Sequence, residues 1–171
     1  AGGTTDGGAG WNNGWSAATG DGLTVKGAQV VQGSNSESTR ELANPFALNG
    51  GAVYYFTFLA RADASGTFAF QMKTSLNQVR WASAKNADDS FTVQGGLTTA
   101  TSAPGLFAGG REYLVVSKFN TSGDIAYVKL FDTADPGDYT TEPTTWDLSA
   151  SGSTGVTIDW LDLDVNAGTV S

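Results

Sequence analysis

The sequence of 171 residues contains no cysteine and no histidine. The first absence excludes disulfides and thiolate nucleophiles, and the second removes the commonest general base of enzyme active sites. Together they exclude Ser-His-Asp triads and zinc sites built from the usual ligands. Any catalysis by this chain would therefore depend on carboxylates, tyrosine, lysine or arginine.

Positive charge and long apolar runs are also scarce. Nine Lys and Arg residues stand against 17 Asp and Glu residues, which gives a formal net charge of -8. Such a chain is repelled by a phosphate backbone or an anionic lipid surface, so we expect no nucleic acid partner. The longest apolar run, residues 52–60, is too short to cross a bilayer as a helix, and we expect no membrane insertion.

Turn-forming and neutral polar residues are abundant instead. The chain has 23 glycines and only 15% charged residues, a composition typical of turn-rich β proteins and of exported bacterial proteins. It begins Ala-Gly-Gly without Met, as a mature protein does after signal-peptide removal, although a shortened chain would begin the same way. We expect a secreted or cell-surface bacterial protein whose residues 1–171 form one domain.

Strand patterns occupy most of the chain after a Gly-rich N-terminal loop at residues 1–22. Residues 53–60 are apolar at both alternate positions, which indicates a strand covered on both faces or lining a groove. After a turn at 61–66, Phe68, Phe70 and Met72 share one face. No long helical period occurs, and some nine to twelve short strands predict an all-β, antiparallel two-sheet β-sandwich or jelly roll.

The clearest hairpin joins residues 112–119 to residues 124–131. Its alternation places one apolar set towards the core, namely Leu114, Val116, Ile125, Tyr127 and Phe131. The last strand, residues 156–165, changes phase between Trp160 and Leu161, which indicates a bulge.

Three stretches resemble a known family. They are Gly-Trp-Ser-Ala-Ala-Thr-Gly-Asp-Gly-Leu-Thr-Val (14–25), Ser-Thr-Arg-Glu-Leu-Ala-Asn-Pro-Phe (38–46) followed by Tyr-Tyr-Phe-Thr-Phe-Leu (54–59), and Asp-Pro-Gly-Asp-Tyr-Thr-Thr-Glu-Pro (135–143). Together they resemble LamG-like jelly rolls of the concanavalin A-like lectin/glucanase superfamily, as in exported proteins of planctomycetes and verrucomicrobia. The resemblance implies two curved sheets, a concave face that often binds glycans, and edge loops that sometimes hold calcium.

A sugar site needs an exposed aromatic ring beside hydrogen-bonding side chains. The candidate rings are Trp11, Trp15, Trp81, Tyr139 and Trp146. The best single cluster is Trp81 with Arg80, Asn77 and Gln71. A single Trp is nevertheless more often a packing residue than a ligand-binding one.

Calcium could be held by carboxylates grouped in a loop. One candidate set is Asp132, Asp135 and Asp138, in an irregular loop at residues 132–143, and another is Asn86, Asp88 and Asp89. Acids that only stabilise their own turns are the more common alternative.

The sequence gives little support for catalysis. Superfamily glucanases carry a Glu-x-Asp-x-x-Glu string that holds two carboxyls about 5–5.5 Å apart, and this string is absent. Alginate-lyase-like members ordinarily use a His, which is also absent. The nearest acidic pair is Asp162 and Asp164, and alternation predicts that both are solvated while Leu161, Leu163 and Val165 face the core. We therefore expect no enzyme.

The resemblance favours a non-catalytic extracellular carbohydrate-binding or adhesion module that binds glycans. The alternative is self-association, as a structural subunit of an extracellular filament, sheath or surface layer built through strand edges. The resembling domains usually open with a strand before the Trp loop, whereas this chain starts inside that loop. A polysaccharide hydrolase or lyase is the weakest of the three hypotheses.

Overall fold

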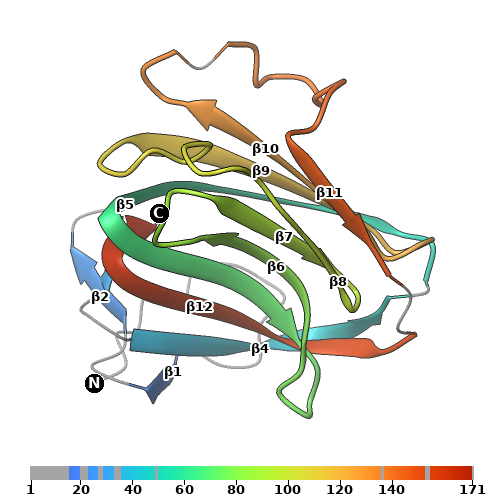
Figure 1. Ribbon diagram of the computed structural model, residues 1–171. Coiled ribbons are helices and arrows are strands. Elements are labelled where there is room, and N and C mark those ends of the chain that lie inside the picture. The colour runs from blue at the N-terminus through green and yellow to red at the C-terminus, as the bar shows by residue number, and fades with distance from the viewer. Residues whose placement is uncertain are drawn as a thin grey trace.

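The computed structural model describes residues 16–19, 23–26, 29–32, 36–48, 50–135, 137–152 and 155–170. These residues form twelve strands and no helix, and all the pairings between neighbouring strands are antiparallel (Figure 1). The predicted all-β antiparallel fold is therefore confirmed. Within these ranges, no helix with the length and hydropathy of a membrane span is found.

Every strand predicted after residue 50 overlaps a strand of the structure. In chain order the strands are β1 (Ser16–Thr19), β2 (Leu23–Lys26), β3 (Gln29–Gln32), β4 (Ser36–Ala47), β5 (Val53–Lys73), β6 (Val79–Lys85), β7 (Phe91–Gly95), β8 (Thr98–Thr101), β9 (Glu112–Asn120), β10 (Ile125–Asp132), β11 (Leu148–Ser151) and β12 (Thr157–Val170).

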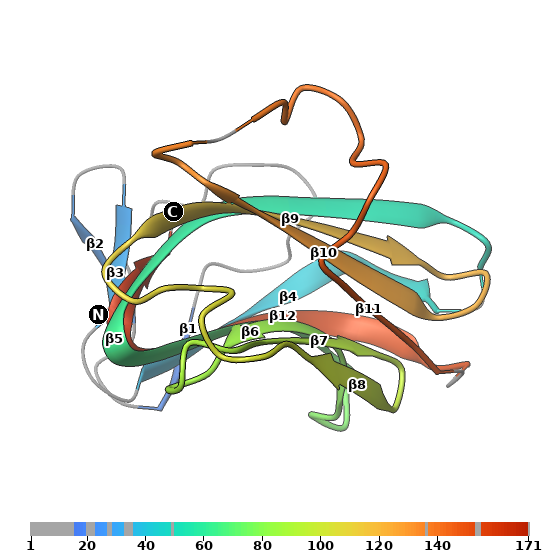
Figure 2. The ribbon, with the colours of Figure 1, turned by 45° about the horizontal axis from the view of Figure 1, so that its top comes forward.

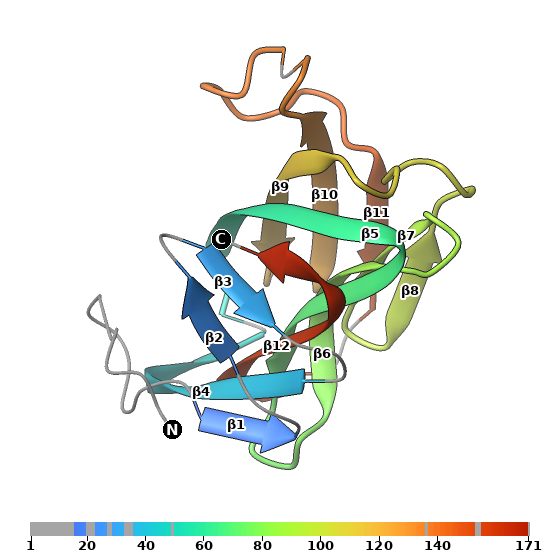
Figure 3. The same ribbon diagram turned by 90° about the vertical axis from the view of Figure 1, so that its left-hand side faces the viewer.

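Two long strands, β5 and β12, run through both layers of a sandwich. Residues 53–61 of β5 pair with β9, and residues 68–73 pair with β6. β12 lies alongside β5 through the same bend. The first sheet has the order β2-β3-β12-β5-β9-β10-β11, and the second has the order β1-β4-β12-β5-β6-β7-β8. Figure 2 shows the two layers facing each other, and Figure 3 shows the β2–β3 hairpin beside the end of β12.

The predicted turn at residues 61–66 is instead a bend within the continuous strand β5. Lys85 supports this bend, because its fully buried Nζ donates hydrogen bonds to the carbonyl oxygens of Ala64 and Gly66, at 3.4 and 2.7 Å. The same ammonium pairs with Asp89 at 2.9 Å. Because the strand bends without ending, its two halves pair in different sheets.

The core lies between the two layers. Phe68 and Met72 face it as predicted, and they are buried. The prediction for the β9–β10 hairpin is wrong, because the core side chains are Val115, Phe119 and Val128, each without exposed surface. The set predicted to face inward, Leu114, Val116, Ile125, Tyr127 and Phe131, occupies the opposite positions, on the outer face of the first sheet.

Glycines bring the layers together at one edge. A side chain on Gly95 would place its Cβ 2.4 Å from the carbonyl oxygen of Ala150, and one on Gly96 would lie 1.8 Å from that of Gly152. Gly96 also has a φ of 62°, a conformation that favours glycine. This close approach sets β7 of the second sheet directly against β11 of the first.

Candidate functional site

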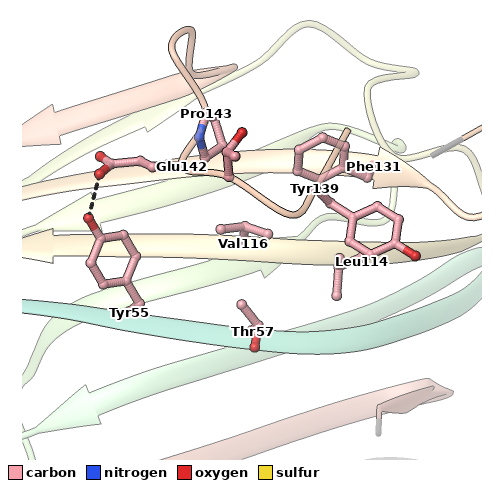
Figure 4. Close-up of a pocket in the computed structure, with 9 residues that line it drawn as sticks. Tyr55, Thr57, Leu114, Val116, Phe131, Tyr139, Glu142 and Pro143 are labelled. Carbon is pink, nitrogen blue, oxygen red and sulfur yellow. Dashed lines mark hydrogen bonds between the residues drawn. The ribbon is translucent and has the colours of Figure 1, made fainter. Parts of the chain in front are cut away.

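A cavity of about 450 Å³ lies on the outer face of the first sheet, beneath the loop that joins β10 to β11. Its floor comes from β5, β9 and β10, and its roof comes from the loop (Figure 4). The lining residues are Tyr55, Thr57, Leu114, Val116, Phe131, Tyr139, Thr141, Glu142 and Pro143. The cavity therefore combines apolar and aromatic surface with hydroxyl groups and one carboxylate.

Strand register explains how the floor forms. Thr57 lies opposite Val116 across β5 and β9, and Leu114 lies opposite Phe131 across β9 and β10. Alternate residues of a strand point to one face, so Tyr55 joins the same surface. The outer positions Val53, Tyr55 and Leu59 are apolar or aromatic like the inner ones, which is why residues 53–60 lack a clean alternation. Of the two predictions for that strand, coverage on both faces or the lining of a groove, the structure shows a groove under a loop.

One carboxylate fastens the loop to the sheet at one end of the cavity. The Tyr55 hydroxyl donates a hydrogen bond of 2.8 Å to Glu142 Oε2, and Lys118 Nζ lies 2.5 Å from Glu142 Oε1. The Lys118 ammonium also lies 5.8 and 5.7 Å from the ring centroids of Tyr55 and Tyr127, within cation–π distance. These contacts position the ring of Tyr55, which lines the cavity.

The hydrogen bonds between Glu142, Lys118 and Tyr55 shift the pKa of each group. The hydrogen bond from Lys118 is the main cause that lowers the pKa of Glu142, and the bond from Tyr55 acts in the same direction. The hydrogen bond to Glu142 raises the pKa of Lys118 and that of Tyr55. At neutral pH the site therefore holds a carboxylate, an ammonium and a neutral phenol.

The C-terminal part of the loop is fastened by a second acid. Asp147 accepts hydrogen bonds from Lys129 Nζ at 2.6 Å and from the backbone N–H of Leu130 at 2.9 Å. Trp146 packs against Tyr127 with ring centroids 5.4 Å apart. A second hollow of about 350 Å³ adjoins the cavity and shares Phe131, Thr141, Glu142 and Pro143 with it.

The predicted cluster around Trp81 does not form. Trp81 has no exposed surface and packs in the core against Phe56 and Phe70, with ring centroids 5.3 and 5.7 Å apart. Its neighbour across β5 is Met72, so Gln71 projects from the opposite face of the sheet. The ring of Trp81 is therefore unavailable to a sugar.

The polar members of that cluster have local roles. Arg80 donates a hydrogen bond of 2.9 Å to the carbonyl oxygen of Val79 and contacts Gln78. Asn77 is exposed in the turn before β6, with a φ of 58°. Neither side chain joins the cavity described above.

The acids predicted to hold calcium do not converge. Asp132 binds Arg111 at 2.6 Å and the backbone N–H of Ala134, while Asp138 accepts two hydrogen bonds from Thr140. Asp135 contributes a backbone N–H to the turn after β10. Among the residues that the structure describes, no group of three or more metal-binding side chains is found.

The alternative calcium set also consists of turn residues. Asn86 donates hydrogen bonds to Ser90 and Thr92, Asp88 accepts two from Ser90, and Asp89 pairs with Lys85. These bonds hold the β6–β7 turn.

One of the predicted aromatic residues lies at the candidate site. Tyr139 lines the cavity, whereas Trp146 packs on Tyr127 and lines neither the cavity nor the adjoining hollow. Trp11 and Trp15 lie outside the described residues. Tyr55 was not predicted as a site residue, because the alternation that revealed its strand did not show which face was covered by the second sheet.

Solved structures provide the comparison that defines the fold. Carbohydrate binding module CBM66 from Bacillus subtilis superposes with a TM-score of 0.56 at 12% identity, over 91% of this chain and 89% of that one. Lectin I-B4 from Griffonia simplicifolia, in its metal-free form, gives 0.52 at 10% identity over 92% and 91%. Bacillus licheniformis beta-glucanase gives 0.53 at 8% identity over 92% and 83%.

The chain has the concanavalin A-like jelly-roll fold. No protein-family model matches its sequence, and no curated protein matches it. The jelly-roll part of the predicted resemblance is thus confirmed, while the LamG-like and taxonomic parts stay predictions. At these identities the neighbours establish the fold alone, and they include both sugar-binding proteins and an enzyme.

Proposed function

We propose that this jelly roll is a non-catalytic, extracellular carbohydrate-binding module, and that the glycan binds on the outer face of the first sheet beneath the β10–β11 loop. The observation that carries the proposal is the cavity of about 450 Å³ with aromatic rings and hydroxyl groups around it. Glycan binding is also in keeping with the carbohydrate-binding module and the lectin that share its fold.

The chemistry of the lining suits a sugar. Pyranose rings present apolar C–H faces, which stack on aromatic rings, and hydroxyls, which need donors and acceptors. Tyr139 is 53% exposed and Tyr55 is 49% exposed, so both rings are accessible. Thr57, Thr141 and Glu142 supply hydrogen-bonding groups around them.

The ionisation of the site supports binding without hydrolysis. A glycosidase holds two carboxyls roughly 5–9.5 Å apart, one of them an acid with a raised pKa. Glu142 is the one carboxylate among the described residues that line the larger cavity, and its pKa is lowered by Lys118. Asp138, in the adjoining hollow, also has a lowered pKa, because it accepts hydrogen bonds from Thr140. Both acids are therefore suited to orient hydroxyl groups and not to donate a proton.

A glycan array probed with the purified chain, with and without calcium, tests the proposal, followed by calorimetry on the best ligand. Tyr139→Ala should weaken binding by about threefold to tenfold, the value of one aromatic stacking contact. Leu76→Ala, at a turn residue that is 77% exposed, is the matched control and should leave the affinity unchanged. Absence of binding to any glycan under both conditions would refute the proposal.

A second candidate function, assembly through strand edges, is favoured by β8. This edge strand pairs with β7 among the described strands, and Thr98–Thr101 contains neither a charge nor a proline to discourage further pairing. The adjacent Leu97 is 71% exposed. Light scattering after size exclusion should reveal oligomers that Thr99→Lys abolishes. A monomer at all concentrations would count against assembly.

A further inference from the structure

A lysine and two carboxyls meet on the outer face of the second sheet, away from the candidate glycan site. Lys73 comes from β5, Asp162 from β12 and Glu37 from β4, three strands that are neighbours in this sheet. Lys73 Nζ lies 2.9 Å from Asp162 Oδ2 and 2.6 Å from Glu37 Oε1. The amine is therefore in contact with both acids at once.

The group is shielded from water. The side chain of Asp162 is 1% exposed, that of Lys73 is 8% exposed and that of Glu37 is 26% exposed. Alternation had predicted a solvated Asp162, so this expectation is wrong, whereas Asp164 is exposed and Leu161, Leu163 and Val165 are buried as predicted. Burying an ion pair is costly.

The proton affinities of the two acids differ. Burial raises the pKa of Asp162 to about 6, against the opposing effect of Lys73. The hydrogen bond from Lys73 is the main cause that lowers the pKa of Glu37. Burial acts to lower the pKa of Lys73, but its bonds to Glu37 and Asp162 outweigh this effect and raise it. Asp162 is thus the acid that is more readily protonated, and Glu37 is an anion in contact with the ammonium.

We propose that Lys73 and Asp162 condense to form an intramolecular amide cross-link, with Glu37 as the proton acceptor. The geometry carries the proposal: a nucleophile held at a buried carboxyl group, with a base at hydrogen-bond distance from the nucleophile. The cross-link is independent of the proposed glycan binding, because none of the three residues lines the cavity.

The reaction needs no oxidant, metal or co-reactant. The raised pKa of Lys73 and the lowered pKa of Glu37 favour the ion pair, so the reaction proceeds from the minor state in which the Lys73 ammonium has given one proton to Glu37. In that state the neutral Nζ attacks Cγ of protonated Asp162. The new N–C bond forms, the C–OH bond breaks, and the hydroxyl leaves as water with a second proton from the nitrogen. Nζ keeps one hydrogen as the amide N–H, and Glu37 ends as a neutral acid. Exclusion of water favours the amide over the separated ions.

The cross-link would join the end of β5 to β12, the last of the described strands in chain order. β12 pairs with β3, β4 and β5, so its release would divide each sheet, leaving β3 and β4 without their connection to β5. A covalent bond at this position prevents β12 from detaching from β5. Such a cross-link suits a protein that must resist heat, proteolysis or mechanical force.

Mass spectrometry of the intact, denatured chain tests the proposal directly. The expected mass is below the sequence mass by one water molecule. Trypsin does not cleave after an acylated lysine, so digestion should yield one branched peptide that joins residues 62–80 to residues 130–171. Asp162→Ala should abolish both signals, and Glu37→Gln should slow their accumulation at least tenfold. Asp164→Ala, the exposed neighbour, is the control and should keep both.

Two results would overturn the cross-link. One is a full sequence mass in both fresh and aged protein. The other is a deficit of one water without the branched peptide, which would instead indicate a succinimide at one of the Asp-Gly sequences, 6–7 or 21–22. Because the first measurement uses the unaltered chain, its outcome does not depend on whether any variant folds.

Discussion

The hydroxyl of Tyr55 donates a 2.8 Å hydrogen bond to the carboxylate of Glu142, although the two residues are 87 positions apart in the sequence. This bond, with the Lys118 ion pair, connects the floor of the candidate glycan site to its roof. An aromatic ring that could stack on a sugar is thereby held at a fixed distance from the loop. The strength of this connection should depend on the ionisation of Glu142.

The pKa of Glu142 should rise when Lys118 is replaced by Gln, because the hydrogen bond from Lys118 is the main cause that lowers it below 4.5. A group with a lowered pKa stabilises the native state above its ordinary pKa, and this contribution is lost as the pH falls through the native value. The loop should therefore loosen only in acid. A ¹³C NMR titration of the glutamate side chains measures the pKa, with Lys129→Gln as the control, since Lys129 pairs with Asp147. Equal shifts in both variants would contradict this explanation.

Trp81→Ala should destabilise the fold by about 3–5 kcal/mol, because it leaves a large void in the core. Trp81 has no exposed surface and contacts Phe56 and Phe70. Urea unfolding measures the change, and Leu76→Ala should stay within about 0.5 kcal/mol of the parent chain. A stable Trp81→Ala variant that no longer binds a glycan would restore Trp81 as a ligand-binding residue.

Gly95→Ala should cost about 1–3 kcal/mol, since the added Cβ would lie 2.4 Å from the Ala150 carbonyl oxygen and force β7 and β11 apart. Gly123→Ala is the matched control, because its Cβ would meet only side-chain atoms of Ile125 at 3.4 Å. That change should be neutral or slightly stabilising. Thermal unfolding of the two variants shows whether the loss of stability comes from the clash with Ala150 or from replacing any glycine. Equal losses of stability in both variants would refute the proposed contact.

Lys85→Met should destabilise the chain by about 3–5 kcal/mol, since it removes the ammonium that bonds to the carbonyl oxygens at the β5 bend and to Asp89. Arg111→Met also breaks an ion pair, but the Arg111 side chain is 64% exposed. It should therefore cost much less than Lys85→Met, because an exposed ion pair is screened by solvent. Denaturant unfolding compares the two, and similar losses would show that the bend does not depend on Lys85.

Much of the candidate site could not be predicted from the sequence. Tyr139 could be proposed because aromatic residues in a polar loop are conspicuous. Tyr55 could not, because both faces of its strand are apolar and nothing local distinguishes a core position from a position under a loop. Trp81 was misplaced for the same reason, since nothing local showed that its ring faces the core while Gln71 projects from the other face of the sheet.

Local patterns in the sequence were enough to predict an antiparallel β protein, because alternation and turn residues act over a few positions and need no distant partner. Composition was enough to exclude the chemistry of cysteine and histidine. The covered face of each strand, in contrast, depends on which strands pair, on where β5 bends and on the loop that closes over the first sheet. These are contacts between residues far apart in the chain, so they became visible only in the folded structure. The same non-local packing buries Asp162 beside Lys73, which makes an expected surface acid the partner of a buried amine.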